Sequence, residues 1–171
     1  MDLGFDVVDL GPADGPAVGE TAPDFVRPLV DGEFWEDVAL SELVARDPDS
    51  PTVLLFHPMD GAFPATYVWN EVRDRGWHED ATVVGLSVSD PYAHKQLLDE
   101  RGIAEDYALY SDPGNGVAEA YGIVNDLDGM AGVAEPRTAA FVLDADRTVE
   151  YAWVAQQHPD FPPYDEVEAE L

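Results

Sequence analysis

Two short apolar runs constrain the fold of this chain more than any other feature of its sequence. Residues 52–56 and 82–88 are almost continuously apolar and rich in β-branched side chains, as is typical of central strands covered on both faces. Helical patterns follow them, at 66–75 and at 91–101. Strands that alternate with helices in this way predict an α/β fold with a central mixed β-sheet and helices on both faces.

Shorter patterns complete the predicted sheet. A hairpin is expected around the turn Asp31-Gly32, and further strands at 5–10, 108–110, 139–143 and 148–154, of which the last two form a second hairpin. Short helices are expected after Ser41, at 115–121 and from Pro163 to Leu171, and the side chains of Ser41 and Asp90 are expected to cap helices.

A chain of 171 residues suits a single compact domain. Residues 1–18 are rich in Gly, Pro, Asp and Ala, which predicts an extended arm that packs loosely. We therefore divide the chain into an N-terminal arm, 1–18, and one domain, 19–171.

The charge balance limits the partners of this chain. It carries 36 acidic against 8 basic residues, a formal net charge of −28. Such a surface repels nucleic acid and anionic membranes, because affinity for phosphates comes from lysine and arginine. With 11% aromatic residues, the chain is too apolar for an acidic disordered protein. The composition instead predicts a halophilic globular protein, whose self-repulsion is screened by salt.

Two further absences bear on location and chemistry. The sequence has no apolar run that approaches a membrane span, and its first residues lack the pattern of a secretory signal; we therefore expect a cytoplasmic protein. It also has no cysteine, which excludes disulfides, thiolate metal sites and cysteine nucleophiles.

Several stretches of the sequence, in order and at matching spacing from about residue 19 to 154, resemble one family. They are Thr21-Ala22-Pro23-Asp24-Phe25, the run from Val84 to Pro91, Ala93-His94-Lys95, Ser111-Asp112-Pro113 and Phe141-Val142-Leu143-Asp144. The chain resembles peroxiredoxins of the alkyl hydroperoxide reductase and thiol-specific antioxidant family, nearest to the bacterioferritin-comigratory type. The resemblance implies a thioredoxin-like fold of the peroxiredoxin type and an antioxidant oxidoreductase ancestry.

In that family a loop of the form Pro-x-x-x-Thr-x-x-Cys follows the first central strand, and its cysteine attacks peroxide. When Pro58 is aligned with the proline of this motif, Ala62 falls at the threonine and Ala65 at the peroxidatic cysteine. Pro58, Asp60 and Thr66 keep the family pattern. The resemblance thus implies a vestigial peroxidatic pocket without catalytic residues.

The arginine of the family falls on Thr138, and the nearest arginine, Arg137, lies one place earlier. On a strand, one residue is a change of face. Two interpretations stay open: Arg137 reaches the pocket through an irregularity of the backbone, or it is an exposed charge among acids. Arg137 and Thr138 complete the predicted pocket.

Other residues are weaker candidates. His57 lies near Asp60, and His94 near Asp90 and Asp99, but nothing in the sequence fixes the three or four convergent ligands that a transition metal requires. We therefore expect no metal and no cofactor. The aromatic residues near the pocket are expected to serve core packing or an oligomer interface, or to border the pocket; they are Phe63, Tyr67, Trp69, Trp77 and Trp153.

Two functions follow from these observations. The first is a binding or assembly scaffold that is not a thiol peroxidase and that forms a homo-oligomer or associates with an active, thiol-bearing relative. The second is an enzyme with non-thiol chemistry in the same pocket, using His57, Asp60, Thr66 or Arg137. The second requires at least two of these side chains to converge within about 3 Å of one point in a cavity.

Overall fold

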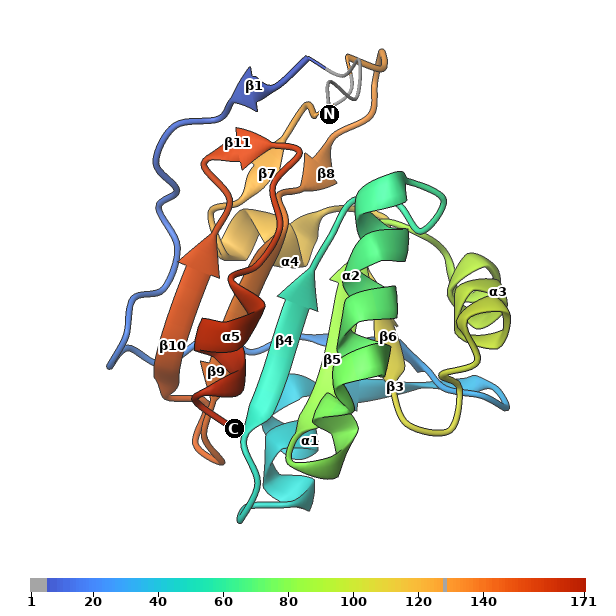
Figure 1. Cartoon of the computed structure of the whole chain (residues 1–171), viewed down its shortest axis with the longest axis vertical. Helices are drawn as coiled ribbons and strands as arrows, with labels where there is room; N and C mark the ends of the chain where they lie inside the picture. Colours follow the sequence, from blue (N-terminus) through green and yellow to red (C-terminus); the bar gives the residue numbers. More distant parts are fainter. Residues whose placement is uncertain (1–5, 128) are drawn as a thin grey trace.

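A seven-stranded mixed sheet forms the centre of the computed structural model, which describes residues 6–127 and 129–171 (Figure 1). Its strand order is β10-β9-β4-β5-β6-β2-β3. The strands are β2 (Val26–Val30), β3 (Trp35–Ala39), β4 (Thr52–Phe56), β5 (Thr82–Ser87), β6 (Ala108–Ser111), β9 (Ala139–Leu143) and β10 (Val149–Val154). β4, β5 and β6 run parallel, and the other strands are antiparallel to their neighbours. The predicted α/β architecture is confirmed.

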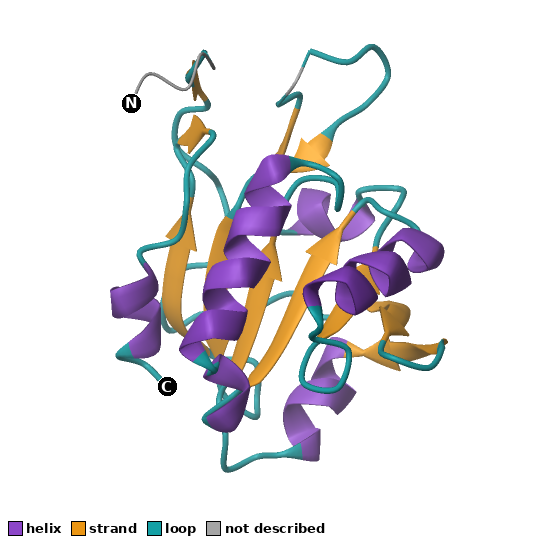
Figure 2. Cartoon of the chain, turned by 45° about the vertical axis from the view of Figure 1, so that its right-hand side comes forward, coloured by secondary structure: helices purple, strands orange, loops and turns teal. Residues whose placement is uncertain are grey.

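Helices cover both faces of this sheet (Figure 2). One face carries α2 (Phe63–Arg75), the short 3-10 helix η1 (Trp77–Glu79), α3 (Pro91–Arg101) and α5 (Tyr164–Glu168). The other face carries α1 (Leu40–Arg46) and α4 (Gly116–Ala120). None of the helices within the described residues is long and apolar enough to cross a membrane.

The position of β4 in the middle of the sheet explains why its sequence is almost continuously apolar. All five of its residues are buried. Val53 and Leu55 pack with Trp69 in the core on the α2 face, whereas Leu54 and Phe56 pack in the core on the opposite face. Alternate side chains of these four apolar residues thus fill two cores, and Thr52, the one polar residue of the strand, is buried at its first position.

Some element boundaries differ from the prediction. Helix α2 begins at Phe63, three residues earlier than expected, with Pro64 in its first turn, where a proline is tolerated. Ser41 does not cap α1; its backbone N–H is instead bound by the side chain of Asp24 at 2.9 Å. The cap at Asp90 is confirmed, because its carboxylate accepts a hydrogen bond from the N–H of Ala93 at 2.8 Å.

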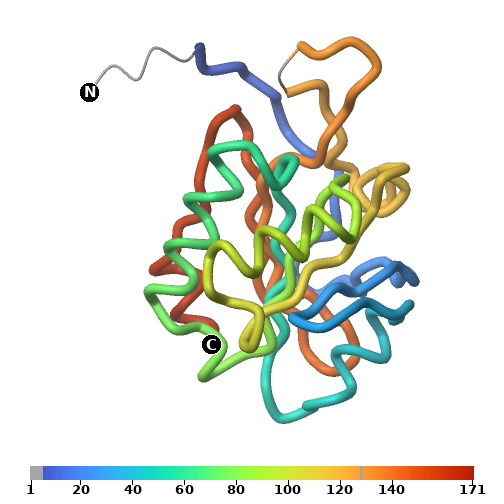
Figure 3. The backbone as a smooth tube through the Cα atoms, turned by 90° about the vertical axis from the view of Figure 1, so that its right-hand side faces the viewer, coloured from blue at the N-terminus to red at the C-terminus, as the bar shows by residue number. Residues whose placement is uncertain are grey.

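The N-terminal arm is paired along part of its length, in contrast to the loose packing that its composition predicts. Strand β1 (Val8–Asp9) pairs with β11 (Gln157–His158), and the arm (blue in Figure 3) passes the end of the molecule that also carries β7 (Val124–Asn125) and β8 (Glu135–Pro136). The expected strand at 5–10 is therefore shorter, and residue 5 lies outside the described residues. Around β1 the arm contributes its backbone rather than its side chains, since Val7 and Val8 are exposed, whereas further along the arm Ala13 packs against the core.

Gly85 in β5 leads to a prediction about stability. A methyl group at this position would lie 2.5 Å from the Trp69 ring and 2.5 Å from the Leu109 side chain. We expect Gly85→Ala to lower the free energy of unfolding by about 1–3 kcal/mol, the usual cost of overpacking a core, as measured by urea denaturation. Gly114→Ala is the matched control, because a methyl group there meets no atom within 4 Å. Equal stabilities of the two variants would contradict this account.

Candidate functional site

The site begins in the loop that joins β4 to α2. Ala62 is the N-cap of α2 and provides no side-chain hydrogen bond. Ala65 is the third residue of the helix, within its first turn, and is fully buried. This is the place that the motif alignment predicts for it. The loop is fixed from two sides, because the N–H of Met59 donates to the carboxylate of the buried Glu135 at 2.7 Å and the N–H of Asp60 to Ser89 Oγ at 3.0 Å.

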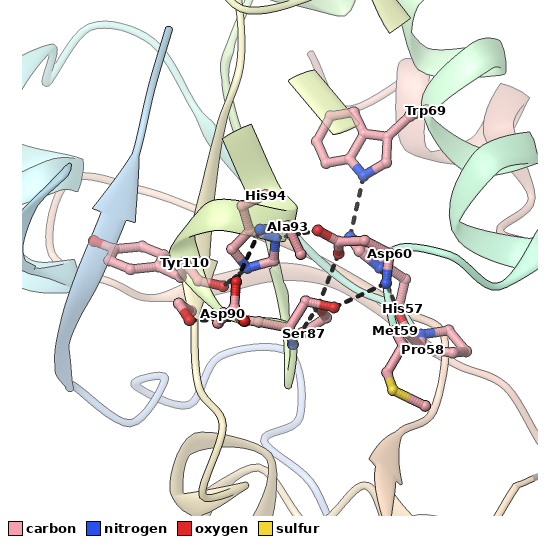
Figure 4. Close-up of polar contacts among 12 residues, drawn as sticks. His57, Pro58, Met59, Asp60, Trp69, Ser87, Asp90, Ala93, His94 and Tyr110 are labelled. Carbon is pink, nitrogen blue, oxygen red and sulfur yellow. Dashed lines mark hydrogen bonds and ion pairs between the residues drawn. The ribbon is translucent and has the colours of Figure 1, made fainter. Parts of the chain in front are cut away.

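A buried pair of Asp60 and His94 connects this loop to helix α3 (Figure 4). His94 Nδ1 lies 2.5 Å from Asp60 Oδ2, and His94 Nε2 lies 2.8 Å from the backbone carbonyl oxygen of Tyr110. Ser87 Oγ donates to the other carboxylate oxygen of Asp60 at 3.0 Å. The carboxylate is therefore held at both oxygens, by groups from β5 and α3.

The chemistry of the partners fixes the protons of this pair. A carbonyl oxygen can only accept, so Nε2 of His94 carries a proton. Burial raises the pKa of Asp60, but the hydrogen bond and charge of His94 and the hydrogen bond of Ser87 outweigh it, and the pKa lies below its ordinary value. We conclude that Asp60 is a carboxylate that receives the Nδ1 proton of His94.

His57 is also buried, but it belongs to a different contact. Trp69 Nε1 donates to His57 Nε2 at 3.1 Å, and His57 Nδ1 donates to the carbonyl oxygen of Pro58 at 2.7 Å. Burial lowers the pKa of His57, so the ring is neutral, and both of its nitrogens are engaged. No group of three or more metal-binding side chains occurs in the parts of the chain that the structure describes.

Arg137 is buried, so the interpretation as an exposed charge is wrong. Its guanidinium donates to the carbonyl oxygens of Leu10 and Gly11 at 2.8 and 2.7 Å, to that of Ala155 at 3.1 Å, and to Asn125 Oδ1 at 2.6 Å. The side-chain hydrogen bonds of Arg137 within the described chain thus hold the N-terminal arm. The hydroxyl of Thr138 is buried without a partner among the described residues.

Two of the predicted polar residues line a common hollow. It has a volume of about 280 Å³ and lies between α2, α3 and the loop at Gly61. Its lining residues are Asp60, Gly61, Thr66, Ala93, Gln96, Leu97, Glu100 and Arg101. Neither His57 nor Arg137 is among them. Of the four side chains proposed for non-thiol chemistry, Asp60 and Thr66 therefore line the hollow together, while His57 and Arg137 each lie elsewhere.

A model of the AhpC/TSA family matches residues 18–152 of the chain. The chain belongs to the AhpC/TSA family. Among curated relatives, the chloroplastic peroxiredoxin Q of Gentiana triflora is 28% identical over 145 residues, which cover 83% of this chain and 61% of the relative. The peroxiredoxin Q of Suaeda salsa is also 28% identical, with 62% of its length covered. The chain thus spans less than two thirds of these relatives.

Solved structures of similar proteins support the same fold. A thiol peroxidase from Chromobacterium violaceum superimposes with a TM-score of 0.74 and 21% identity, covering 98% of this chain and 91% of the other. The peroxidoxin BcpB of Mycobacterium tuberculosis gives a TM-score of 0.66 and 28% identity, covering 80% and 84%. The thioredoxin-like fold of the peroxiredoxin type is confirmed, in an AhpC/TSA chain without cysteine.

Sequence reasoning missed the partners that organise this site. The sequence places His94 near Asp90 and Asp99, its neighbours on the same helix, whereas its carboxylate partner in the structure is Asp60, 34 residues away. Ser87 and Ser89 lie in a stretch that carries the family resemblance. The resemblance of that stretch was the sequence feature that could have drawn attention to the two serines. Only the fold shows that their hydroxyls contact Asp60 in the loop before α2.

Proposed function

We propose that this AhpC/TSA chain is not a thiol peroxidase and acts as a binding or assembly scaffold. The observation that carries the proposal is Ala65, a buried methyl group in the first turn of α2, where the motif alignment places the peroxidatic cysteine. Peroxide reduction in this family begins when a thiolate attacks a peroxide oxygen. A methyl group cannot make this attack, and the chain contains no other cysteine to replace it.

The surroundings of Ala65 support the same conclusion. Ala62 offers no hydroxyl at the threonine position. Val68, which the motif alignment places at the family's acidic or amide residue three positions after the cysteine, is an apolar side chain buried in the core. The guanidinium of Arg137 donates its hydrogen bonds to the N-terminal arm, to Asn125 and to Ala155. The groups that would activate a thiolate are therefore replaced or committed elsewhere, together with the thiol itself.

The proposed partners are a second copy of this chain or a thiol-bearing relative of the same fold, in the cytoplasm. Nucleic acid and anionic membranes are unsuitable, because the net charge of −28 repels both. Sedimentation velocity of the purified chain in 2 M potassium chloride tests self-association, and affinity capture from its own cells in the same salt tests the relative. A monomer that captures no peroxiredoxin would contradict the scaffold role.

A second candidate function is non-thiol chemistry in the hollow, favoured by one observation: Asp60 and Thr66 both line it. The hydrogen bonds of the site argue against it, since both ring nitrogens of His57 and of His94 are engaged. Neither of these two imidazoles therefore has a free nitrogen that could act as a general base for the Thr66 hydroxyl. The scaffold proposal is the better supported of the two.

Loss of peroxidase activity is directly testable. We expect metal-free protein to show no turnover of hydrogen peroxide or an organic hydroperoxide when coupled to a thioredoxin system, because no thiolate can form. Ala65→Cys is expected to react far more slowly than family members, since Ala62 and Val68 are unchanged. Ala65→Ser is the matched control for the volume of the new side chain. Turnover by the natural chain, or family-like rates from Ala65→Cys, would refute this view of the site.

A further inference from the structure

The hollow between α2 and α3 contains an arginine without a carboxylate partner. In a chain with 36 acidic residues, such an arginine is unusual. Five other arginines of the described chain lie against carboxylates; these are Arg27, Arg46, Arg73, Arg75 and Arg147. Arg137 is also without an ion pair, but its guanidinium is buried and donates four hydrogen bonds to carbonyl oxygens and to Asn125. Arg101 forms no ion pair with any described residue, and its guanidinium has one long hydrogen bond, 3.5 Å to Asn70 Oδ1, a distance at which such a bond is weak.

Asp60 supplies a fixed negative charge to the same hollow. Its two oxygens each accept one hydrogen bond, from Ser87 and from His94, whereas a carboxylate has about four acceptor positions. The residue is 9% exposed and lines the hollow. Its remaining acceptor capacity is thus available to a ligand, and its orientation is set before any ligand binds, which lowers the entropic cost of binding.

The position of these groups along α3 separates the charges. Ala93 lies at the Asp60 end, and Arg101 follows eight residues later, about 12 Å along the helix axis at 1.5 Å per residue. The guanidinium of Arg101 extends toward Asn70 on α2, and Arg101 and Asp60 both line the hollow. Asp60 and Arg101 form no ion pair with each other within the described residues, so each of these two charged groups of the hollow can meet a group of a ligand.

Other lining groups add polarity between the two charges. The hydroxyl of Thr66 has no hydrogen-bond partner within the described residues. Gln96 Nε2 donates to Glu100 Oε1 at 2.9 Å, which orients that second carboxylate on the same face of α3. Ala93 and Leu97 provide an apolar wall suited to a short alkyl chain.

We propose that this hollow binds a small zwitterion, an amino acid whose ammonium group contacts Asp60 and whose carboxylate contacts Arg101 and Thr66. Free anions are disfavoured by the net charge of −28, and a free cation would leave Arg101 unpaired. A zwitterion satisfies both ends without adding net charge. The volume of about 280 Å³ lies just below the roughly 300–1,000 Å³ of pockets for drug-sized ligands, which suits a small ligand. The inference does not depend on the proposed scaffold function.

Isothermal titration calorimetry tests this site with glycine, β-alanine and 4-aminobutyrate, whose charges are increasingly far apart, at the lowest potassium chloride concentration at which a thermal melt shows the protein to be folded. We expect saturable binding of at least one of them. Butyrate and butylamine, which each carry one of the two charges, are expected to bind at least tenfold more weakly, because each leaves a charged group of the site without its partner.

Variants locate the binding. Arg101→Gln is expected to weaken the binding of the best amino acid at least tenfold, and Thr66→Val severalfold, while thermal melts show that both variants are folded. Arg46→Gln is the matched control, since Arg46 lies on α1 at the opposite face and forms exposed ion pairs. Absence of saturable binding, equal binding of butyrate or butylamine, or binding that Arg101→Gln leaves unchanged would overturn the proposal. Peroxidase assays and sedimentation of the same samples report separately on the scaffold function.

Discussion

The melting temperature of this protein is expected to rise steeply as potassium chloride is increased from 0.05 M to about 1 M at pH 7. With 36 acidic and 8 basic residues, most carboxylates have no cationic partner and repel one another across the folded surface. Salt shortens the screening length from about 14 Å at 0.05 M to about 3 Å at 1 M. The folded state gains more from this screening than the unfolded chain, in which the same charges lie further apart.

The free energy that screening recovers sets the size of this rise in melting temperature. If screening recovers about 4 kcal/mol, the midpoint of thermal unfolding rises by about 8–16 °C for a chain of this length. Circular dichroism melts from 0.05 to 3 M potassium chloride provide the measurement. Sucrose is the control, because it is excluded from the protein surface without screening charge, and it should produce only a gradual rise. A flat melting temperature in salt would mean that the acidic surface serves a basic partner rather than a saline environment.

Removal of His94 is expected to cause the largest loss of stability among single substitutions in the site. In His94→Ala, the buried carboxylate of Asp60 loses the donor 2.5 Å away but keeps its desolvation cost. Breaking one partner of a buried ion pair costs about 3–5 kcal/mol. Urea denaturation of the variant at pH 7 should therefore show a free energy of unfolding lower by that amount.

Two controls separate charge from packing in this experiment. His78→Ala removes the histidine of a partly exposed pair with Asp106, 3.7 Å apart, and should cost less than about 1 kcal/mol. The double variant His94→Ala/Asp60→Ala should lose less free energy of unfolding than the two single variants lose together, because it leaves neither charged group buried without its partner. Additive losses would show that the pair is held by packing alone.

Acid should weaken the same pair. The pKa of Asp60 is lowered in the fold from its ordinary value of 3.8. Its contribution to stability is therefore present above that value and is lost as the pH falls through the lower, folded pKa. His94→Ala should remove this part of the acid dependence, which adds a pH readout to the measurement at pH 7.

Elements that depend on local pattern could be predicted from the sequence. The run at β4, the hairpin of β9 and β10 and the cap at Asp90 all rest on neighbouring residues. The cap of α1 could not be predicted, because Asp24 reaches the N–H of Ser41 from 17 residues away. The start of α2 was placed too late, since Pro64 is equally typical of a loop and of a first helical turn.

The candidate site was predictable only in part, for the same reason. The alignment placed Ala65 in the first turn of α2, because strand, loop and helix are consecutive in the chain. The contacts of Asp60 and Arg137 span 34 and up to 127 residues, and their partners are a histidine on another helix and backbone carbonyl groups. No sequence pattern marks a carbonyl oxygen as the partner of a particular arginine.

The arm held by Arg137 has a consequence for how this molecule folds and opens. Its guanidinium binds residues 10 and 11 across separations of 127 and 126 residues, so these bonds close nearly the longest loop available in the chain. Such closure can occur only after residues 125 and 155 are in place and belongs to a late stage of folding. Conversely, the arm can detach without disturbing the seven-stranded sheet, because β1 pairs only with β11 within the described chain. We therefore expect the arm to open before the seven-stranded sheet does, in a state that exposes the guanidinium of Arg137 and removes Ala13 from the core surface.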